Sequence, residues 1–110
     1  MSAATLEASI MAYIEAANAQ DVSAAARCFS EDAVVKDEGR ERRGVAAIRD
    51  WAEEVSRKYR PTLKPLSAAT VNGKTVVTAR VSGHFAGSPL DLRYEFTIDG
   101  QKITRLEIAP

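Results

Sequence analysis

The chain has 110 residues, and this length predicts one folded domain that spans residues 1–110. Apolar residues make up 45% and charged residues 27% of the sequence, which excludes a wholly disordered chain. Fifteen basic and fifteen acidic side chains cancel, so we expect no nucleic-acid partner. One cysteine and one histidine exclude an internal disulfide and a zinc cluster.

Hydropathy argues against a role in membranes. No apolar run approaches the ~18 residues that a membrane span needs, and the N-terminus lacks the basic start and apolar core of a signal peptide. We therefore expect no membrane partner and a cytoplasmic location. The sequence also gives no reason to expect a cofactor.

Apolar residues recur at spacings of three and four near the N-terminus, which predicts two amphipathic helices. Thr5 is the expected cap of the first helix, which ends in a turn at residues 18–21, and Asp21 or Ser23 is the expected cap of the short second helix. The residues expected to face inward are Leu6, Ile10, Tyr13, Ile14 and Ala17, then Val22, Ala25, Ala26 and Phe29.

The next segment predicts a short strand at residues 33–37 and a polar loop at residues 38–44. From Val45 the helical period returns, and Pro61 ends this third helix because the residue before a proline disfavours helical backbone angles. Its apolar stripe comprises Ile48, Trp51, Ala52, Val55 and Tyr59.

The second half of the chain changes to the alternating period of strands. Asn72-Gly73 is a strong hairpin signal because both residues accept a positive φ, and it predicts strands at 63–71 and 74–85. A two-residue turn then pairs Val71 with Lys74, Ala68 with Val77 and Leu66 with Ala79. Further strands are expected near 91–98 and at 103–108. Helices followed by an antiparallel meander predict an α+β domain with its helices on one side of the sheet.

Three strings in the sequence carry a family resemblance: AYIEAANAQD at residues 12–21, CFSEDAVVKD at 28–37 and RGVAAIRDW at 43–51. With the closing strands they resemble the nuclear transport factor 2-like superfamily, in particular its SnoaL-like and ketosteroid isomerase-like members. The resemblance implies a cone-shaped, cystatin-like fold, in which three helices close over a curved, mainly antiparallel sheet and an apolar pocket opens between them. This fold hosts isomerases, cyclases, epoxide hydrolases, dehydratases and noncatalytic proteins, so the resemblance leaves the reaction open.

The resemblance implies catalytic roles for Tyr13 and Asp37. In isomerases of this family a tyrosine of the first helix donates to the substrate oxygen, and an aspartate at the end of the first strand moves the proton. Removing a proton next to a carbonyl requires such a pair, a carboxylate that reaches carbon and a donor that meets the developing oxyanion. If Val35 faces inward, strand alternation puts Asp37 inside the cone, where burial would raise its pKa.

Structural roles for the same two residues remain open. Tyr13 could be a core residue whose hydroxyl bonds a backbone carbonyl, and Asp37 could pair with a loop arginine, Arg40, Arg42 or Arg43.

The isomerases also have a second acid on a late strand, and Asp91 is its local counterpart here. Strand alternation puts Asp91 on the outer face and Leu92 inside, unless a bulge shifts the register. The alternation therefore predicts that the second acid of the isomerases is missing here.

We accordingly expect a small-molecule-binding SnoaL-like protein, with cofactor-independent isomerase or cyclase activity next to a carbonyl of an apolar substrate as its specific hypothesis. The alternative is a noncatalytic ligand-binding or dimerisation module of the same fold, with the cone filled by side chains. The residues expected to line the pocket, besides the catalytic pair, are Phe29, Val35, Trp51, Tyr94 and Phe96. A homodimer is expected through the outer sheet face, which would carry Arg80, His84, Arg93 and Glu95.

Overall fold

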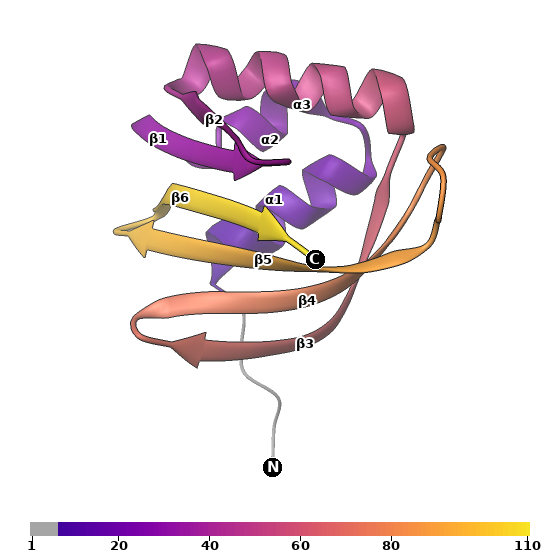
Figure 1. Ribbon diagram of the computed structural model, residues 1–110. Helices are drawn as coiled ribbons and strands as arrows, with labels where there is room; N and C mark the ends of the chain where they lie inside the picture. Colours follow the sequence, from indigo (N-terminus) through magenta and orange to yellow (C-terminus); the bar gives the residue numbers. More distant parts are fainter. Residues whose placement is uncertain (1–6) are drawn as a thin grey trace.

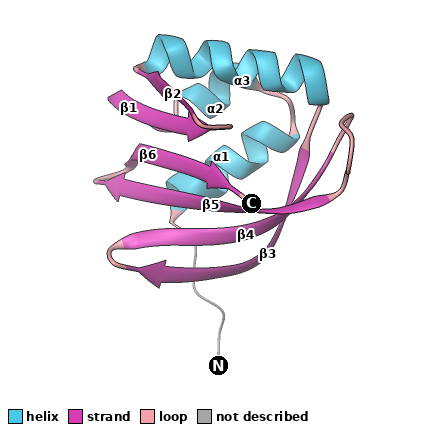
Figure 2. Cartoon of the chain, viewed as in Figure 1, coloured by secondary structure: helices cyan, strands magenta, loops and turns pink. Residues whose placement is uncertain are grey.

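The computed structural model describes residues 7–110, which form three helices and six strands (Figure 1). The helices are α1 (Ala8–Asn18), α2 (Val22–Ala26) and α3 (Val45–Tyr59). The strands are β1 (Phe29–Asp37), β2 (Arg40–Arg43), β3 (Thr62–Val71), β4 (Lys74–Ser82), β5 (Leu90–Asp99) and β6 (Lys102–Ala109). Figure 2 shows all three helices on the same side of the curved sheet, which confirms the expected α+β layering. None of these helices is long and apolar enough to span a membrane.

The six strands form one sheet in the order β2-β1-β6-β5-β4-β3. Among residues 7–110, β1 and β6 form a parallel pair, and every other neighbouring pair is antiparallel. The C-terminal strand therefore lies between the first strand and the β3–β5 meander (Figure 1). This arrangement brings the end of β1 onto the same face as residues of β5, although the two strands are far apart in the sequence.

The third helix begins and ends where the sequence predicts. Gly44, with a φ of 91°, precedes it, and Arg60 ends it in the left-handed conformation immediately before Pro61. Ile48 and Trp51 are buried on the face that packs towards the sheet. The capping prediction for α2 is also confirmed at Asp21, whose side chain accepts a hydrogen bond from the Ala24 amide at 3.1 Å. The expected cap Thr5 and the expected core residue Leu6 lie outside the described residues.

The segment expected to be a polar loop at 38–44 instead contains strand β2. Asp37 pairs with Arg40 across a two-residue turn, in which Glu38 and Gly39 both have a positive φ, 55° and 75°. The turn is the hairpin type that normally selects asparagine or aspartate followed by glycine. Glutamate at the first position weakens that signal, and the charged side chains of β2 show no apolar alternation, so the sequence pattern concealed the hairpin.

The second helix is shorter than expected, because α2 ends at Ala26 and Phe29 already belongs to β1. Phe29 pairs with Ile103 of β6, and the register shifts between Phe29 and Val34. The Phe29 side chain would be buried both at the end of α2 and at the start of β1. Its apolar character therefore could not show which of the two elements contains it.

The β3–β4 hairpin has the expected register near its turn but not further along. Val71 pairs with Lys74 and Ala68 with Val77, as predicted. Ala79, however, pairs with Pro65 rather than Leu66, because the register shifts between Pro65 and Ser67. A proline has no backbone N–H to donate, which is why proline in a sheet occurs at edges and irregularities such as this one.

One continuous core fills the space between the helices and the sheet. The side chains with almost no exposure belong to α1, α3 and the four strands β1, β4, β5 and β6, and include Ile10, Val35, Ile48, Val77, Phe96, Ile103 and Leu106. The end of α1 is tied to the start of β3 by Asn18, whose amide accepts from the Leu63 N–H at 2.7 Å and donates to the Leu63 carbonyl at 3.0 Å. These two bonds hold one end of α1 over the sheet.

Candidate functional site

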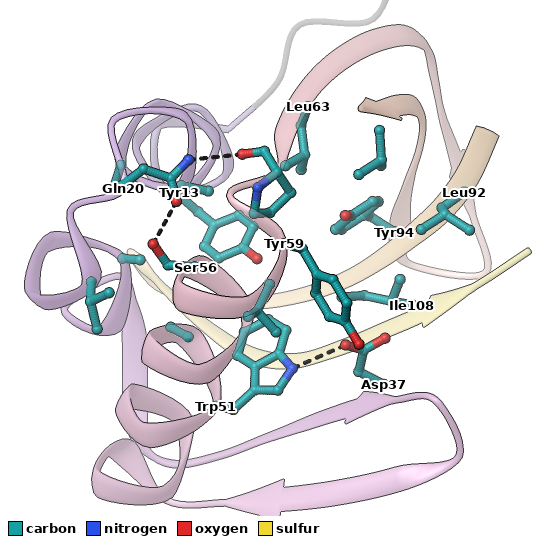
Figure 3. Close-up of a pocket in the computed structure, with 18 of the residues that line it drawn as sticks. Tyr13, Gln20, Asp37, Trp51, Ser56, Tyr59, Leu63, Leu92, Tyr94 and Ile108 are labelled. Atoms are coloured by element: carbon teal, nitrogen blue, oxygen red, sulfur yellow. Dashed lines mark hydrogen bonds between the residues drawn. The ribbon is translucent and has the colours of Figure 1, made fainter. Parts of the chain in front are cut away.

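A cavity of about 320 Å³ lies between the helices and the inner face of the sheet. Figure 3 shows it enclosed on several sides by α1, α3 and the central strands. Its apolar wall includes Ala16, Ala17, Val22, Ala25, Ala52, Val55, Leu63, Val81, Leu92 and Ile108. Its aromatic residues are Tyr13, Trp51, Tyr59, Phe85 and Tyr94, and its carboxylates are Asp21, Asp37 and Glu38. A concave, mostly apolar site with a few convergent polar groups is typical of small-molecule binding.

Tyr13 is held in place by the aromatic residues beneath it. Its ring packs edge-on against Phe29, at 5.6 Å between centroids, and against Phe96 at 5.9 Å. The Tyr13 hydroxyl makes no hydrogen bond with any described residue, so the expected alternative of a backbone carbonyl partner is not realised. Burial raises the pKa of Tyr13 well above its usual value, and the nearby Tyr94 and Asp37 raise it further. The phenol therefore stays protonated and can donate into the cavity.

Asp37 is the last residue of β1 and is directed into the cavity by the tight β1–β2 turn that follows it. The indole Nε1 of Trp51 donates to its Oδ2 at 3.0 Å (Figure 3). Burial raises the pKa of the Asp37 carboxyl above its usual value, while the Trp51 bond and the nearby charge of Arg42 oppose that rise. A carboxylate in this environment is a stronger base than one in water.

None of the three arginines of β2 forms an ion pair with Asp37. Arg42 instead lies 3.7 Å from the Glu54 carboxylate of α3. Arg40 pairs with Asp37 only through the backbone of the hairpin. Within residues 7–110, the carboxyl group of Asp37 thus has a neutral donor, Trp51, as its side-chain partner.

Tyr94 adds a second phenol to the same wall. It lies on β5, stacks on Phe96 with ring centroids 6.3 Å apart, and is 6% exposed. Burial raises the pKa of its hydroxyl, and the charge of nearby Asp37 raises it further. Strand alternation in the sequence predicts only that Tyr94 faces the pocket, because it gives the direction of a side chain and not the groups that the side chain contacts.

Asp91 lies outside the cavity on the outer face of β5. It is exposed and accepts a hydrogen bond from Arg80 at 3.0 Å, an interaction that lowers the pKa of Asp91 below its usual value. The neighbouring Leu92 lines the cavity instead. Strand alternation therefore holds through this part of β5, and the position of the second acid in the isomerases is not matched by Asp91.

The lining differs from the expected set in three residues. Trp51 and Tyr94 do line the cavity, but Phe29, Val35 and Phe96 do not. These three are between 0% and 3% exposed and form the packed layer beneath the wall. A side chain on the inner face of the sheet therefore does not always line the cavity, because helices α1 and α3 pack directly on part of that face.

Two aromatic residues near the mouth were not among the expected lining residues. Tyr59, at the end of α3, packs edge-on against Phe85 in the loop after β4, with ring centroids 6.1 Å apart. The His84 amide donates to the Tyr59 carbonyl at 2.7 Å and fixes this loop against the helix. A Cβ on Gly83 would lie 2.6 Å from the same carbonyl oxygen, so the approach requires glycine. Helical periodicity in the sequence predicts that Tyr59 lies on the apolar stripe of α3. The position of Phe85 is set by the conformation of the loop after β4, which no periodicity predicts.

A small polar hollow of about 100 Å³ adjoins the cavity and shares Asp37, Glu38, Trp51, Val55 and Tyr59 with its lining. Its charged residues are Asp37, Glu38, Arg40, Arg42, Glu54 and Lys58. No group of three or more His, Cys, Asp or Glu side chains across residues 7–110 is placed to hold a metal ion.

A cone of three helices over a curved sheet, with a cavity between them, is the fold that the chain shares with a solved nuclear transport factor 2-like protein. Residues 10–106 match the family model of the SnoaL-like domain, and the chain belongs to this family. No curated protein matches the chain.

Three solved structures are similar over nearly the whole chain. A candidate polyketide cyclase from Sinorhizobium meliloti has 39% identity and a TM-score of 0.89, with 94% of each chain covered. A protein of ketosteroid isomerase-like fold from Catenulispora acidiphila, in complex with trimethylamine, has 18% identity and a TM-score of 0.84, covering 96% of this chain and 87% of that one. The epoxide hydrolase/cyclase-like enzyme SalBIII of salinomycin pyran ring formation has 19% identity and a TM-score of 0.81, covering 92% and 86%. The last two likenesses concern the fold.

Proposed function

We propose that this SnoaL-like protein binds a small apolar molecule in its cavity and acts as a cofactor-independent isomerase or cyclase. One observation carries the proposal: the Tyr13 hydroxyl and the Asp37 carboxyl line the same largely apolar cavity. The similarity to a candidate polyketide cyclase at 39% identity supports a substrate with carbonyl groups. The volume of the cavity disfavours a cone filled by its own side chains, whereas a noncatalytic ligand-binding module of the same fold remains the alternative.

The proposed reaction begins with proton transfer from the carbon next to a substrate carbonyl to the Asp37 carboxylate. The electron pair of the broken C–H bond moves to the carbonyl oxygen, where Tyr13 and Tyr94 donate hydrogen bonds to the enolate. In an isomerisation Asp37 then returns the proton to another carbon. In a cyclisation the enolate carbon bonds to the carbon of a second carbonyl, whose π electron pair moves to its oxygen, and that oxygen takes the proton from Asp37. The Trp51 N–H holds the carboxylate in one orientation through both steps.

Trp51 provides a direct test of ligand binding, since it is the only tryptophan of the chain and lines the cavity. We expect its fluorescence to change saturably when a panel of apolar ketones and enones is titrated. The Tyr13→Phe variant should bind these ligands about fivefold more weakly, because it loses one hydrogen bond worth roughly 1 kcal/mol while its ring stays packed. Met11→Ala, an exposed change on the same helix, should leave affinity unchanged. If no carbonyl compound binds, or if Tyr13→Phe has no effect on those that do, the proposal fails.

We also propose that two copies associate through the outer sheet face. Arg80, Arg93 and Glu95 lie on that face, which therefore carries charges of both signs and could match itself across a two-fold axis. Light scattering at high micromolar concentration should give twice the monomer mass, and Arg93→Glu should weaken the association. A monomeric mass for the unmodified chain would contradict this proposal.

A further inference from the structure

The charges on the cavity wall are all of one sign. Asp21, Asp37 and Glu38 line it, and none of its described lining residues is lysine, arginine or histidine. A bound carboxylate or phosphate beside the partly desolvated Asp37 would find no basic lining side chain to pair with, and the exposed Asp21 and Glu38 carry charge of the same sign, which is unfavourable. The cavity wall therefore disfavours anions as ligands.

The nearest basic groups do not alter this conclusion. Arg40, Arg42 and Lys58 line the adjoining polar hollow rather than the cavity, and Arg42, whose charge lowers the pKa of Asp37, lies 3.7 Å from Glu54. The side-chain donor to Asp37 is the uncharged Trp51 indole. A cation that reached Asp37 from the cavity would thus meet a partly desolvated carboxylate that has no ion-pair partner among the described residues.

The walls around that carboxylate are aromatic. Figure 3 shows Trp51, Tyr59 and Tyr94 around the part of the cavity near Asp37, with Tyr13 on helix α1. Phe85 is the fifth aromatic residue of the cavity lining. The faces of aromatic rings attract cations, and several rings together form the cages that recognise quaternary ammonium groups. Aromatic walls also suit the alkyl groups of such a ligand.

The Tyr13 and Tyr94 hydroxyls in the cavity are hydrogen-bond donors, so their partner is an acceptor rather than a cation. Tyr13 and Tyr94 are 5% and 6% exposed and line the cavity, and no hydrogen bond joins their hydroxyls to any residue of the described chain. Both phenols are therefore free to donate to a ligand atom that accepts hydrogen bonds. A carbonyl oxygen meets this requirement.

We infer that the cavity takes an apolar amino ketone, with its carbonyl oxygen at the two tyrosine hydroxyls and its cationic nitrogen against Asp37 and the aromatic walls. Such a compound satisfies each of these polar groups at once, which neither a neutral ketone nor a carboxylic acid does. The inference rests on the proposed function for the carbonyl half of the ligand and adds the positive charge. It does not depend on proton transfer.

Three aryl ketones of similar size separate the charge preference from ketone binding. Phenacyltrimethylammonium carries the cation, 3,3-dimethyl-1-phenylbutan-1-one is its neutral isostere, and 3-benzoylpropanoate carries a carboxylate. Calorimetric titration of the unmodified protein should show the cation binding ~10-fold or more tightly than the isostere, and the carboxylate binding least. Asp37→Asn should remove most of the preference for the cation and change the affinity for the isostere by less than about twofold. Asp91→Asn, the matched exposed change, should leave the preference intact.

The outcomes distinguish this inference from the proposed function. If the isostere binds as tightly as the cation, or the carboxylate binds comparably, the inference is overturned while ketone binding stands. A cation preference that survives in Asp37→Asn would overturn the assigned counter-ion. Binding of the cation alone would support the charge preference and remove the support for neutral ketone substrates. If none of the three binds, both proposals fail.

Discussion

Replacing Asp37 with asparagine is expected to reduce turnover of a ketone or enone substrate by ~100- to 10,000-fold, the typical contribution of a general acid–base group. The substitution preserves the size of the side chain, and the asparagine Oδ1 can still accept the bond from Trp51 Nε1, which spans 3.0 Å in the native protein. The titrating group is lost and little else changes. Turnover measured at saturating substrate isolates this effect from any change in affinity.

The stability of the Asp37→Asn variant distinguishes a catalytic from a structural carboxylate. Because burial raises the pKa of Asp37 in the folded state, ionisation of this group opposes folding above that pKa. The opposition fades as the pH falls towards the unfolded value near 3.8. Asparagine removes the ionisation, so we expect the melting temperature at pH 7 to be equal to or above that of the native chain. The difference should shrink at pH 4.

Asp91→Asn is the matched control for this experiment. It makes the same chemical change on an exposed side chain that pairs with Arg80 outside the cavity. The interaction with Arg80 lowers the pKa of Asp91, so the stability it contributes is present at neutral pH and is lost as the pH falls through that lowered pKa. Turnover should be unaffected. If Asp37→Asn instead lowers the melting temperature and leaves turnover intact, Asp37 has a structural role only.

Replacing Phe96 with alanine is expected to lower the free energy of unfolding by ~3–5 kcal/mol, which is a large part of the stability of a domain this size. Phe96 is 1% exposed and packs against the rings of both Tyr13 and Tyr94. The truncation therefore leaves a void beneath the wall that carries the two phenols. Urea denaturation with a common slope for both proteins would measure the loss.

Met11→Ala is the control for the core substitution, because Met11 is 48% exposed on α1. Its effect should stay within about 0.5 kcal/mol. A loss below ~1 kcal/mol for Phe96→Ala would contradict the assignment of Phe96 to the packed layer, since core phenylalanine truncations cost several times more. Such a result would instead favour an exposed position on the cavity wall.

Local patterns in the sequence were sufficient for most elements of this fold. The limits of α3 follow from the helical stripe after Val45 and from Pro61, and the β3–β4 turn follows from Asn72-Gly73. The alternation of β5 placed Leu92 inside and Asp91 outside, as the structure has them. Each of these features depends on interactions within a few residues of the chain, which is why a pattern of spacing can reveal it.

The resemblance to SnoaL-like proteins added the two residues on which the proposed chemistry rests. Tyr13 and Asp37 were singled out from strings in the first half of the chain, and both line the cavity. The side chains that lie next to Asp37 in the folded protein could not be predicted from these strings. The Trp51 bond to Asp37 joins α3 to the end of β1, and the proximity of Tyr94 depends on β6 lying between β1 and β5.

By itself, then, the sequence determined the α+β class and the order of the helices and the later strands, and its resemblance to SnoaL-like proteins singled out Tyr13 and Asp37. Only the tertiary structure decided that Arg40–Arg43 is a strand, because that hairpin is stabilised by pairing with β1 rather than by an apolar pattern of its own. It also decided which inward residues line the cavity. Phe29 and Phe96 face inward yet are covered by Tyr13, whereas Tyr59 and Phe85 reach the mouth only because α3 and the loop after β4 meet there. Cavity walls depend on how elements pack at long range, and a periodicity of two or 3.6 residues records only the direction of each side chain.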